Sequence, residues 1–148
     1  MQLFSRTAVY LQNPFMKKIL LLVPFVATLI LGCDPDPSVE KAIIGEWKWI
    51  RSVGGFSGAD TLAPGPADTV ILTLQSDQTW KKQQNGQILM QGGYTVSQVT
   101  SIYTGQPAPA LFLDVSAGDE LLITVDNNDL VLTENHTEPY VHSYKKFP

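Results

Sequence analysis

The chain has 148 residues, a length typical of a single domain, with ten basic side chains, 14 acidic side chains and one cysteine. Three of the basic residues precede Cys33 and all 14 acidic residues follow it, so the segment after Cys33 is strongly acidic and disfavours nucleic acid as a partner. One cysteine excludes an intrachain disulfide and a cluster of thiolate metal ligands, and no cofactor is expected.

The first predicted element is a bacterial export signal. Lys17 and Lys18 directly follow Met16, and residues 19–31 form an uncharged run. This is the composition of a signal peptide, and the run is shorter than the about 20 apolar residues that a membrane span needs. The run ends in Ile-Leu-Gly-Cys at residues 30–33, which resembles the lipobox of bacterial lipoproteins. The resemblance implies cleavage before Cys33 and acylation of that cysteine, and several acyl chains anchor a protein stably.

These features divide the sequence into three parts. Residues 1–32 are predicted to be the signal peptide, with translation starting at Met16, and residues 33–42 to be the lipidated cysteine and a tether. Residues 43–148 are the predicted folded domain. The expected location is the cell envelope, with Cys33 anchored in a membrane, the outer membrane being favoured, and the domain in the periplasm or at the cell surface. A secreted protein with an incidental cysteine is the alternative.

The tether leads into a short helix and a first strand. A single helical turn is predicted from Ser38 to Ile44, with Ser38 as the N-cap and Gly45 ending it. Residues 46–53 then alternate, with Trp47 and Trp49 on one face. A period of two with aromatic residues is typical of a strand.

The middle of the chain contains hairpin signals. In chain order, we predict a loop at 54–68, a strand at 69–74, a turn at 76–78 and strands at 79–84 and 88–96. Asn85-Gly86 is a strong hairpin signal between the last two strands. Lys81 and Lys82 are expected at a solvated edge, and Gly92-Gly93 is expected to form a bulge or sharp bend.

The last third continues in the same way. A loop is predicted at 104–109, followed by strands at 111–115, 120–125, 130–133 and 140–147. Turns are expected at Gly118 and at Asn127-Asn128. In the last strand, Tyr140, His142 and Tyr144 share one face.

Eight short strands in series predict an all-β fold, an eight-stranded antiparallel up-and-down barrel. Such a barrel is either filled by its own side chains or holds one small ligand. A β-sandwich gives similar strand spacing and remains the alternative.

The motif Gly45-Glu46-Trp47 before a long glycine- and proline-rich loop resembles the Gly-x-Trp signature of lipocalins. Residues 44–55, together with Tyr144-Lys145-Lys146 near the end, resemble lipocalin-like lipoproteins of Gram-negative bacteria. The resemblance implies that Gly45, Trp47 and Lys146 close the base of the barrel, with the lysine over the indole ring where lipocalins usually carry arginine. It also implies that the barrel binds a small apolar ligand.

The candidate ligand-binding residues are four aromatic side chains, although core packing explains them as well: Trp49, Trp80, Tyr94 and Tyr144. No catalytic motif such as Gly-x-Ser-x-Gly is present, and we expect no enzyme activity. His136 and His142 are expected to be structural rather than metal ligands. The expected function is a monomeric, membrane-tethered binding module. The alternative is a protein-interaction or inhibitor module of the envelope with a filled barrel.

Overall fold

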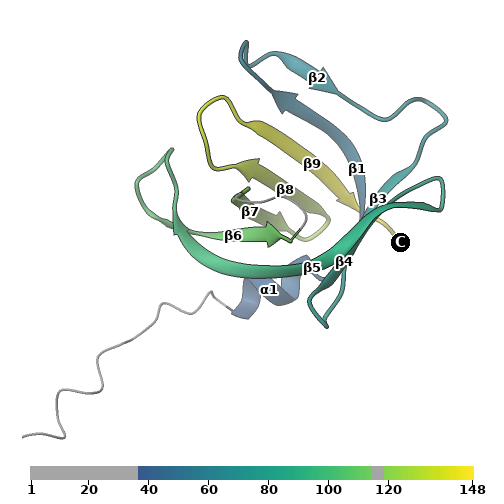
Figure 1. Ribbon diagram of the computed structural model, residues 1–148, viewed down its shortest axis with the longest axis horizontal. Helices are drawn as coiled ribbons and strands as arrows, with labels where there is room; N and C mark the ends of the chain where they lie inside the picture. Colours follow the sequence, from purple (N-terminus) through teal and green to yellow (C-terminus); the bar gives the residue numbers. More distant parts are fainter. Residues whose placement is uncertain (1–36, 115–118) are drawn as a thin grey trace, which may run out of the picture. The chain divides into compact units, whose positions relative to one another are not determined.

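The computed structural model describes residues 37–114 and 119–148 (Figure 1). The predicted signal peptide, the predicted lipidation site Cys33 and the predicted turn at Gly118 lie outside the described residues. Within the described part, no helix is both long and apolar enough to cross a membrane.

The described residues form one helix and nine strands. In chain order these are α1 (Pro37–Ile43), β1 (Gly45–Gly54), β2 (Asp60–Leu62), β3 (Val70–Leu74), β4 (Thr79–Gln84), β5 (Gln87–Thr100), β6 (Pro107–Leu113), β7 (Leu121–Asp126), β8 (Asp129–Glu134) and β9 (Tyr140–Lys146). The predicted all-β class is confirmed.

Eight of the strands form a closed antiparallel up-and-down barrel. Each strand from β3 to β9 pairs with its neighbour in sequence, and β1 closes the barrel by pairing with both β3 and β9. The strands form a single closed sheet, so the alternative prediction of a β-sandwich is wrong. The ninth strand, β2, lies in the segment predicted to be a loop. Within the described residues it pairs only with the second half of β1, where Leu62 faces Ser52 (Figure 1).

The first strand carries an irregularity that alternation alone does not predict. The register of β1 against β9 shifts between Trp49 and Arg51, so Ile50 is an extra residue in β1. Trp47 and Trp49 share the inner face as expected, but after the bulge Ser52, rather than Arg51, is the next buried residue. A bulge changes which side chains face inward because it adds one residue to a period of two.

The short helix begins one residue earlier than expected. It starts at Pro37, and proline is favoured at the first helical position. Ser38 therefore lies inside the helix and is not its N-cap. Ile43, at the end of the helix, is almost fully buried in the core of the barrel.

The hairpin between β4 and β5 follows the prediction at its turn but not along its length. Asn85 and Gly86 both have positive φ angles, 52° and 82°, as a type I′ turn requires. The bulge lies at Leu89, because Ile88 faces Gln83 while Met90 faces Lys82. The bulge expected at Gly92-Gly93 is wrong, because Thr79 faces Gly93 and Trp80 faces Gly92 without a shift in register. The other expectation for these residues, a sharp bend, stays a prediction.

The two glycines instead make room for a carboxylate. A Cβ atom on Gly92 would collide with the Asp114 side chain. Asp114 Oδ2 accepts a hydrogen bond from the Gly93 backbone N–H at 2.8 Å. The absence of side chains therefore permits a close contact between β5 and the end of β6.

The strand β6 starts earlier than expected, at Pro107 within the predicted loop 104–109. Pro107 and Pro109 pair with β5, and among the described residues only Ala110 and Leu111 of β6 also pair with β7. Pro107 and Pro109 thus lie in the part of β6 that does not pair with β7, so the edge of the strand that faces away from β5 requires no N–H donor there. A strand tolerates proline at such positions.

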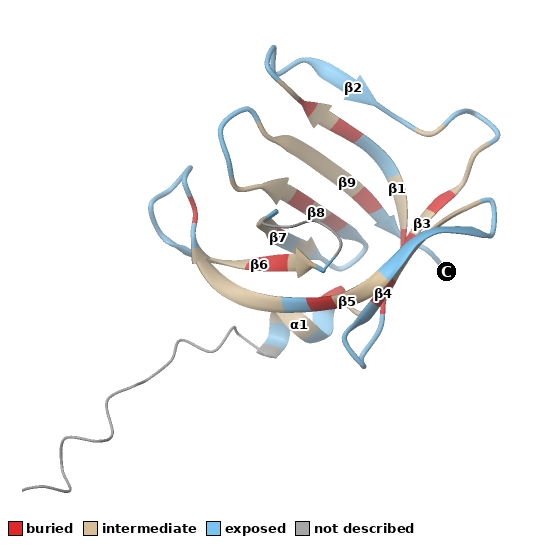
Figure 2. Cartoon of the chain, in the orientation of Figure 1, coloured by how far each residue is buried: buried red, intermediate tan, exposed pale blue. Residues whose placement is uncertain are grey.

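The core fills the part of the barrel nearest to the helix. Figure 2 shows buried segments on the barrel strands and exposed residues along β2 and the hairpin turns. The largest cluster of buried side chains combines aliphatic and aromatic residues: Ile43, Trp47, Leu72, Leu74, Trp80, Tyr94, Leu111, Ile123, Leu130, Leu132 and Tyr144.

Candidate functional site

The base of the barrel is closed by Trp47. The residue is 0% exposed, and its indole N–H donates to the backbone oxygen of Ile43 at 2.7 Å. This hydrogen bond joins the first barrel strand to the end of α1. It also satisfies the one polar atom of a side chain that is otherwise buried among apolar groups.

Lys146 lies over the same ring from the last strand. Its Nζ atom is 4.2 Å from the centre of the Trp47 indole and donates to the backbone oxygen of Ile44 at 2.8 Å. Gly45 has a φ of 137°, and a Cβ atom there would collide with the Lys146 ammonium group. The structure thus brings Gly45, Trp47 and Lys146 together at the base, in the arrangement that the resemblance implied.

A cavity of about 320 Å³ opens above this base. Its position follows from the strand directions, because β1 runs from Trp47 at the base to Trp49 and Ser52 in the cavity wall. The wall is largely apolar but contains several polar groups. It is formed by Trp49, Ser52, Leu62, Leu72, Trp80, Lys82, Met90, Leu113, Asp119, Leu121, Leu132, Glu134, His142 and Tyr144.

Three of the four predicted ligand-binding residues line this cavity, namely Trp49, Trp80 and Tyr144. Tyr94 lies elsewhere. It is 3% exposed, belongs to the core, and its hydroxyl donates to the backbone oxygen of Gln75 at 2.7 Å. Tyr94 therefore packs the base and is not a ligand residue of this cavity.

A chain of hydrogen bonds runs along one wall. Trp49 Nε1 donates to Ser52 Oγ at 3.0 Å, and Ser52 Oγ lies 2.7 Å from His142 Nδ1. When Nδ1 accepts a hydrogen bond from the serine hydroxyl, the ring proton is on Nε2, which lies 3.4 Å from Glu134 Oε1. The other oxygen of Glu134 lies 3.1 Å from Nε2 of His136. The wall thus connects strands β1, β9 and β8 through polar side chains.

The two histidines differ in their tendency to bind a proton. Burial lowers the pKa of His142, although the Glu134 carboxylate acts in the opposite direction. A hydrogen bond to the backbone oxygen of Thr137 raises the pKa of the exposed His136, and Glu134 adds to this effect. At neutral pH the cavity wall therefore contains a neutral imidazole.

Burial also raises the pKa of Tyr144, to about 12. Its hydroxyl keeps its proton at neutral pH and remains a hydrogen-bond donor in the cavity.

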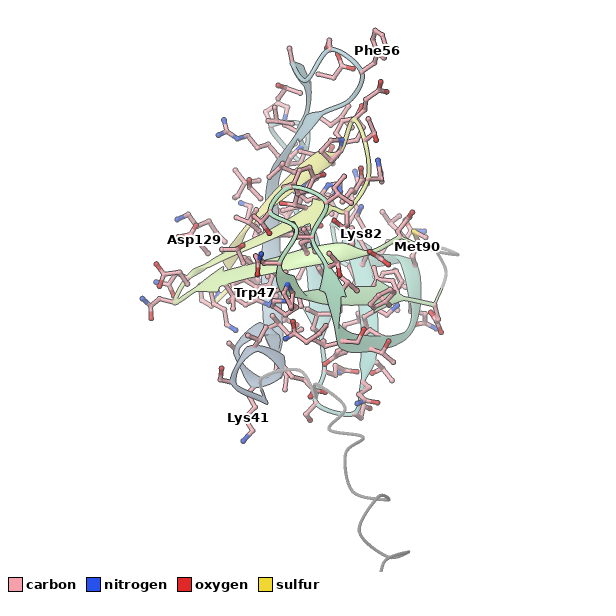
Figure 3. All side chains as sticks on the ribbon, turned by 90° about the vertical axis from the view of Figure 1, so that its left-hand side faces the viewer. Lys41, Trp47, Phe56, Lys82, Met90 and Asp129 are labelled. Atoms are coloured by element: carbon pink, nitrogen blue, oxygen red, sulfur yellow. The ribbon has the colours of Figure 1, made fainter. Side chains whose placement is uncertain are left out.

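Trp80 and Lys82 occupy the opposite side of the cavity. Trp80 is 3% exposed, and among the described residues its Nε1 atom has no hydrogen-bond partner. Lys82 was expected at a solvated edge, and this expectation is wrong. Its side chain lines the cavity with Nζ 5.6 Å from the centre of the Trp49 ring (Figure 3 labels Lys82). Trp80 and Lys82 alternate along β4 on the same face, while Lys81 lies between them on the other.

Sequence reasoning missed five polar residues of the cavity: Ser52, Lys82, Asp119, Glu134 and His142. Only His142 carried a signal, since it was placed on one face with Tyr144. The bulge at Ile50 that turns Ser52 inward has no signature in the sequence. Across residues 37–114 and 119–148, no three His, Cys, Asp or Glu side chains are grouped so that they could hold a metal ion.

Comparisons of the chain with protein-family models, with curated proteins and with solved structures find no match.

Proposed function

We propose that the protein is a membrane-tethered, lipocalin-like binding module that holds a small, mostly apolar ligand inside its barrel. The observation that carries this proposal is the cavity of about 320 Å³ above the Trp47 base. Ligand sites are concave, largely apolar and contain a few convergent polar groups, and their volumes begin at about 300 Å³. The cavity wall has this composition.

The volume limits the size of the ligand. At about 30 Å³ for each water molecule, the cavity has room for about ten waters, which corresponds to a ligand of about ten non-hydrogen atoms. A molecule with a long acyl chain would have to extend through the mouth of the barrel.

The tether is the part of the proposal that depends on the sequence alone. The paired lysines, the apolar run and the lipobox-like residues before Cys33 support it. A location in the cell envelope, with the outer membrane favoured, follows from that motif, and we propose a monomer.

The alternative, an interaction or inhibitor module, was expected to have a filled barrel. The cavity therefore favours ligand binding over this alternative.

Binding is also favoured over catalysis. Ser52, His142 and Glu134 lie in a row, but the serine contacts Nδ1 of the histidine and the carboxylate faces Nε2, the reverse of the usual arrangement in serine hydrolases. The serine is only 2% exposed, and its oxygen already accepts a hydrogen bond from the indole N–H of Trp49. These features favour a structural hydrogen-bond chain.

The test is a titration of the full-length chain with 1-octanol, an apolar molecule of suitable size. Trp49 and Trp80 line the cavity, so binding should change the tryptophan fluorescence, and calorimetry gives the affinity. Leu113→Trp, which adds bulk within the cavity, should weaken binding, whereas Ile50→Trp at an exposed position of β1 should not. Absence of binding to the parent protein, or equal binding by both variants, would contradict the proposal.

A further inference from the structure

One asparagine fastens the turn between β4 and β5 to the residues that precede β3. The backbone N–H of Asn85 donates to the Thr69 backbone oxygen at 2.9 Å, and the Thr69 N–H donates back to Asn85 Oδ1 at 2.8 Å. The other side-chain atom, Nδ2, donates to Asp68 Oδ1 at 2.8 Å. Because Thr69 offers a donor and Asp68 an acceptor, only one orientation of the side-chain amide satisfies both. These three hydrogen bonds are called the Asn85 clamp below.

The same turn is chemically labile. Asparagine is among the thermolabile residues, and Gly86 has no side chain to hinder an attack by its own backbone nitrogen on the Asn85 side chain. Both residues are exposed. A Cβ atom on Gly86 would meet no atom of a described residue within 4 Å, apart from its chain neighbours. Water and hydroxide can therefore reach this peptide bond.

Deamidation of Asn85 would proceed by a balanced set of bond changes. A hydroxide ion takes the proton of the Gly86 N–H, and the nitrogen attacks Asn85 Cγ. As the new C–N bond forms, the bond from Cγ to Nδ2 breaks, and Nδ2 leaves as ammonia after taking a proton from water, which restores the hydroxide. Water then opens the cyclic imide at either carbonyl and gives aspartate or isoaspartate. The net change consumes water, releases ammonia and involves no oxidation.

The clamp holds the side-chain atoms that this reaction has to move. Cγ must turn toward the Gly86 nitrogen until the two atoms are about 3–3.5 Å apart. Oδ1 is held by the Thr69 N–H and Nδ2 by the Asp68 carboxylate. The hydrogen bond from Asn85 is also the largest cause of the lowered pKa of Asp68, so this acceptor is charged at neutral pH. A charged acceptor forms the stronger kind of hydrogen bond.

We propose that Asn85 is a latent deamidation site that the Asn85 clamp, and Asp68 in particular, keeps unreactive in the folded protein. Asp68 is a positioning residue here, because it holds the asparagine side chain and takes no part in the bond changes. The inference is independent of the proposed ligand binding.

Loss of the clamp would affect a hairpin that forms part of the cavity wall. Trp80 and Lys82 of β4 and Met90 of β5 line the cavity. A carboxylate at position 85 could not rebuild the clamp, because it would face the Asp68 carboxylate and like charges repel. Isoaspartate would also lengthen the backbone of a two-residue turn, whose geometry sets the register of the adjoining strand residues. Deamidation would therefore loosen one side of the cavity irreversibly.

The test follows deamidation at Asn85 in the full-length chain during incubation at mildly alkaline pH and body temperature. Mass spectrometry of proteolytic peptides gives the deamidated fraction and separates aspartate from isoaspartate. A synthetic peptide of residues 82–89 gives the rate in the absence of a fold. We expect the parent protein to react at least about tenfold more slowly than the peptide, because the folded chain reacts only from locally opened states. Equal rates would overturn the proposal.

Two aspartate variants separate the clamp from a general loosening of the turns. Asp68→Ala removes the acceptor of Asn85 Nδ2 and should raise the rate about fivefold. Asp77→Ala is the matched control, since Asp77 also has a lowered pKa and accepts hydrogen bonds in a turn beside β4, but from Thr79. It should leave the rate within about twofold of the parent. Equal acceleration by the two variants would overturn the assignment to Asp68.

A conservative variant and an internal reference complete the test. Asp68→Asn keeps an oxygen that can accept from Asn85 Nδ2 but removes the charge, so its rate should lie between those of the parent and Asp68→Ala. Asn127, which also has a positive φ in a hairpin turn, is the reference in each sample, and its rate should not change in Asp68→Ala. A rate for Asp68→Asn as high as that for Asp68→Ala, or a parallel acceleration at Asn127, would contradict the role of Asp68.

Discussion

Replacement of Trp47 by alanine is the most direct test of how the barrel base is held. The side chain is 0% exposed, and removing a buried tryptophan costs about 3–5 kcal/mol. We expect a value in the upper half of that range, because the change also removes the hydrogen bond to Ile43 that connects the barrel to α1. A loss of this size is a large share of the total stability of a small domain, about 5–15 kcal/mol.

The assay is urea unfolding of the full-length chain, followed by circular dichroism because the substitution removes a fluorophore. Lys146→Ala is the comparison. It removes the cation over the indole and its bond to Ile44, and should cost only about 0.5–2 kcal/mol. A Trp47→Ala midpoint equal to that of the parent, or one above that of Lys146→Ala, would refute the view that the indole holds the base together.

Three further predictions concern other parts of the molecule. Gly45→Ala should destabilise the domain by about 1–3 kcal/mol in the same assay, because φ is positive at Gly45 and the new Cβ atom displaces Lys146. Gly58 also has a positive φ but lies in open space, so a smaller cost for Gly45→Ala than for Gly58→Ala would contradict this prediction. Proton titration by NMR should give His142 a midpoint below pH 6.5 and His136 a midpoint above it, and the reverse order would contradict the shifts described for the two pKa values. Because the pKa of His142 is lowered on folding, its contribution to stability is present above pH 6.5 and falls as the pH decreases. Cys33→Ser should release the protein from the membrane fraction, and unchanged retention would exclude a lipid anchor on that residue.

Local signals in the sequence located most of the barrel. The Asn85-Gly86 turn is sufficient to place the end of β4 and the start of β5, because a two-residue turn determines the register of the strand residues next to it. Signals of this kind are absent from β2, a strand of three exposed residues that pairs with β1. The pairing of β2 with β1 across a long loop depends on tertiary structure and therefore produces no periodic pattern in the sequence.

The cavity was harder to predict for the same physical reason. Large aromatic residues such as Trp49 could be assigned to the interior from alternation, but alternation does not separate the packed base from the open part above it. Tyr94 therefore looked equivalent to Trp80, although Trp80 lines the cavity and Tyr94 does not. A bulge at one residue, Ile50, determines that Ser52 faces His142, and this depends on the pairing of β1 with β9.

The position of α1 has a consequence for how a ligand would arrive. Lys41 of α1 and Phe56 lie at opposite ends of the described domain (Figure 3), and the cavity lies on the far side of Trp47 from the helix. Cys33 precedes Pro37 by four residues, which reach at most about 14 Å, whereas the ten residues of β1 extend about 33 Å. A lipid on Cys33 would thus hold the helix end toward the bilayer and direct the mouth of the barrel to the aqueous side. Occupancy would then follow the concentration of free solute in that compartment rather than the amount dissolved in the anchoring membrane.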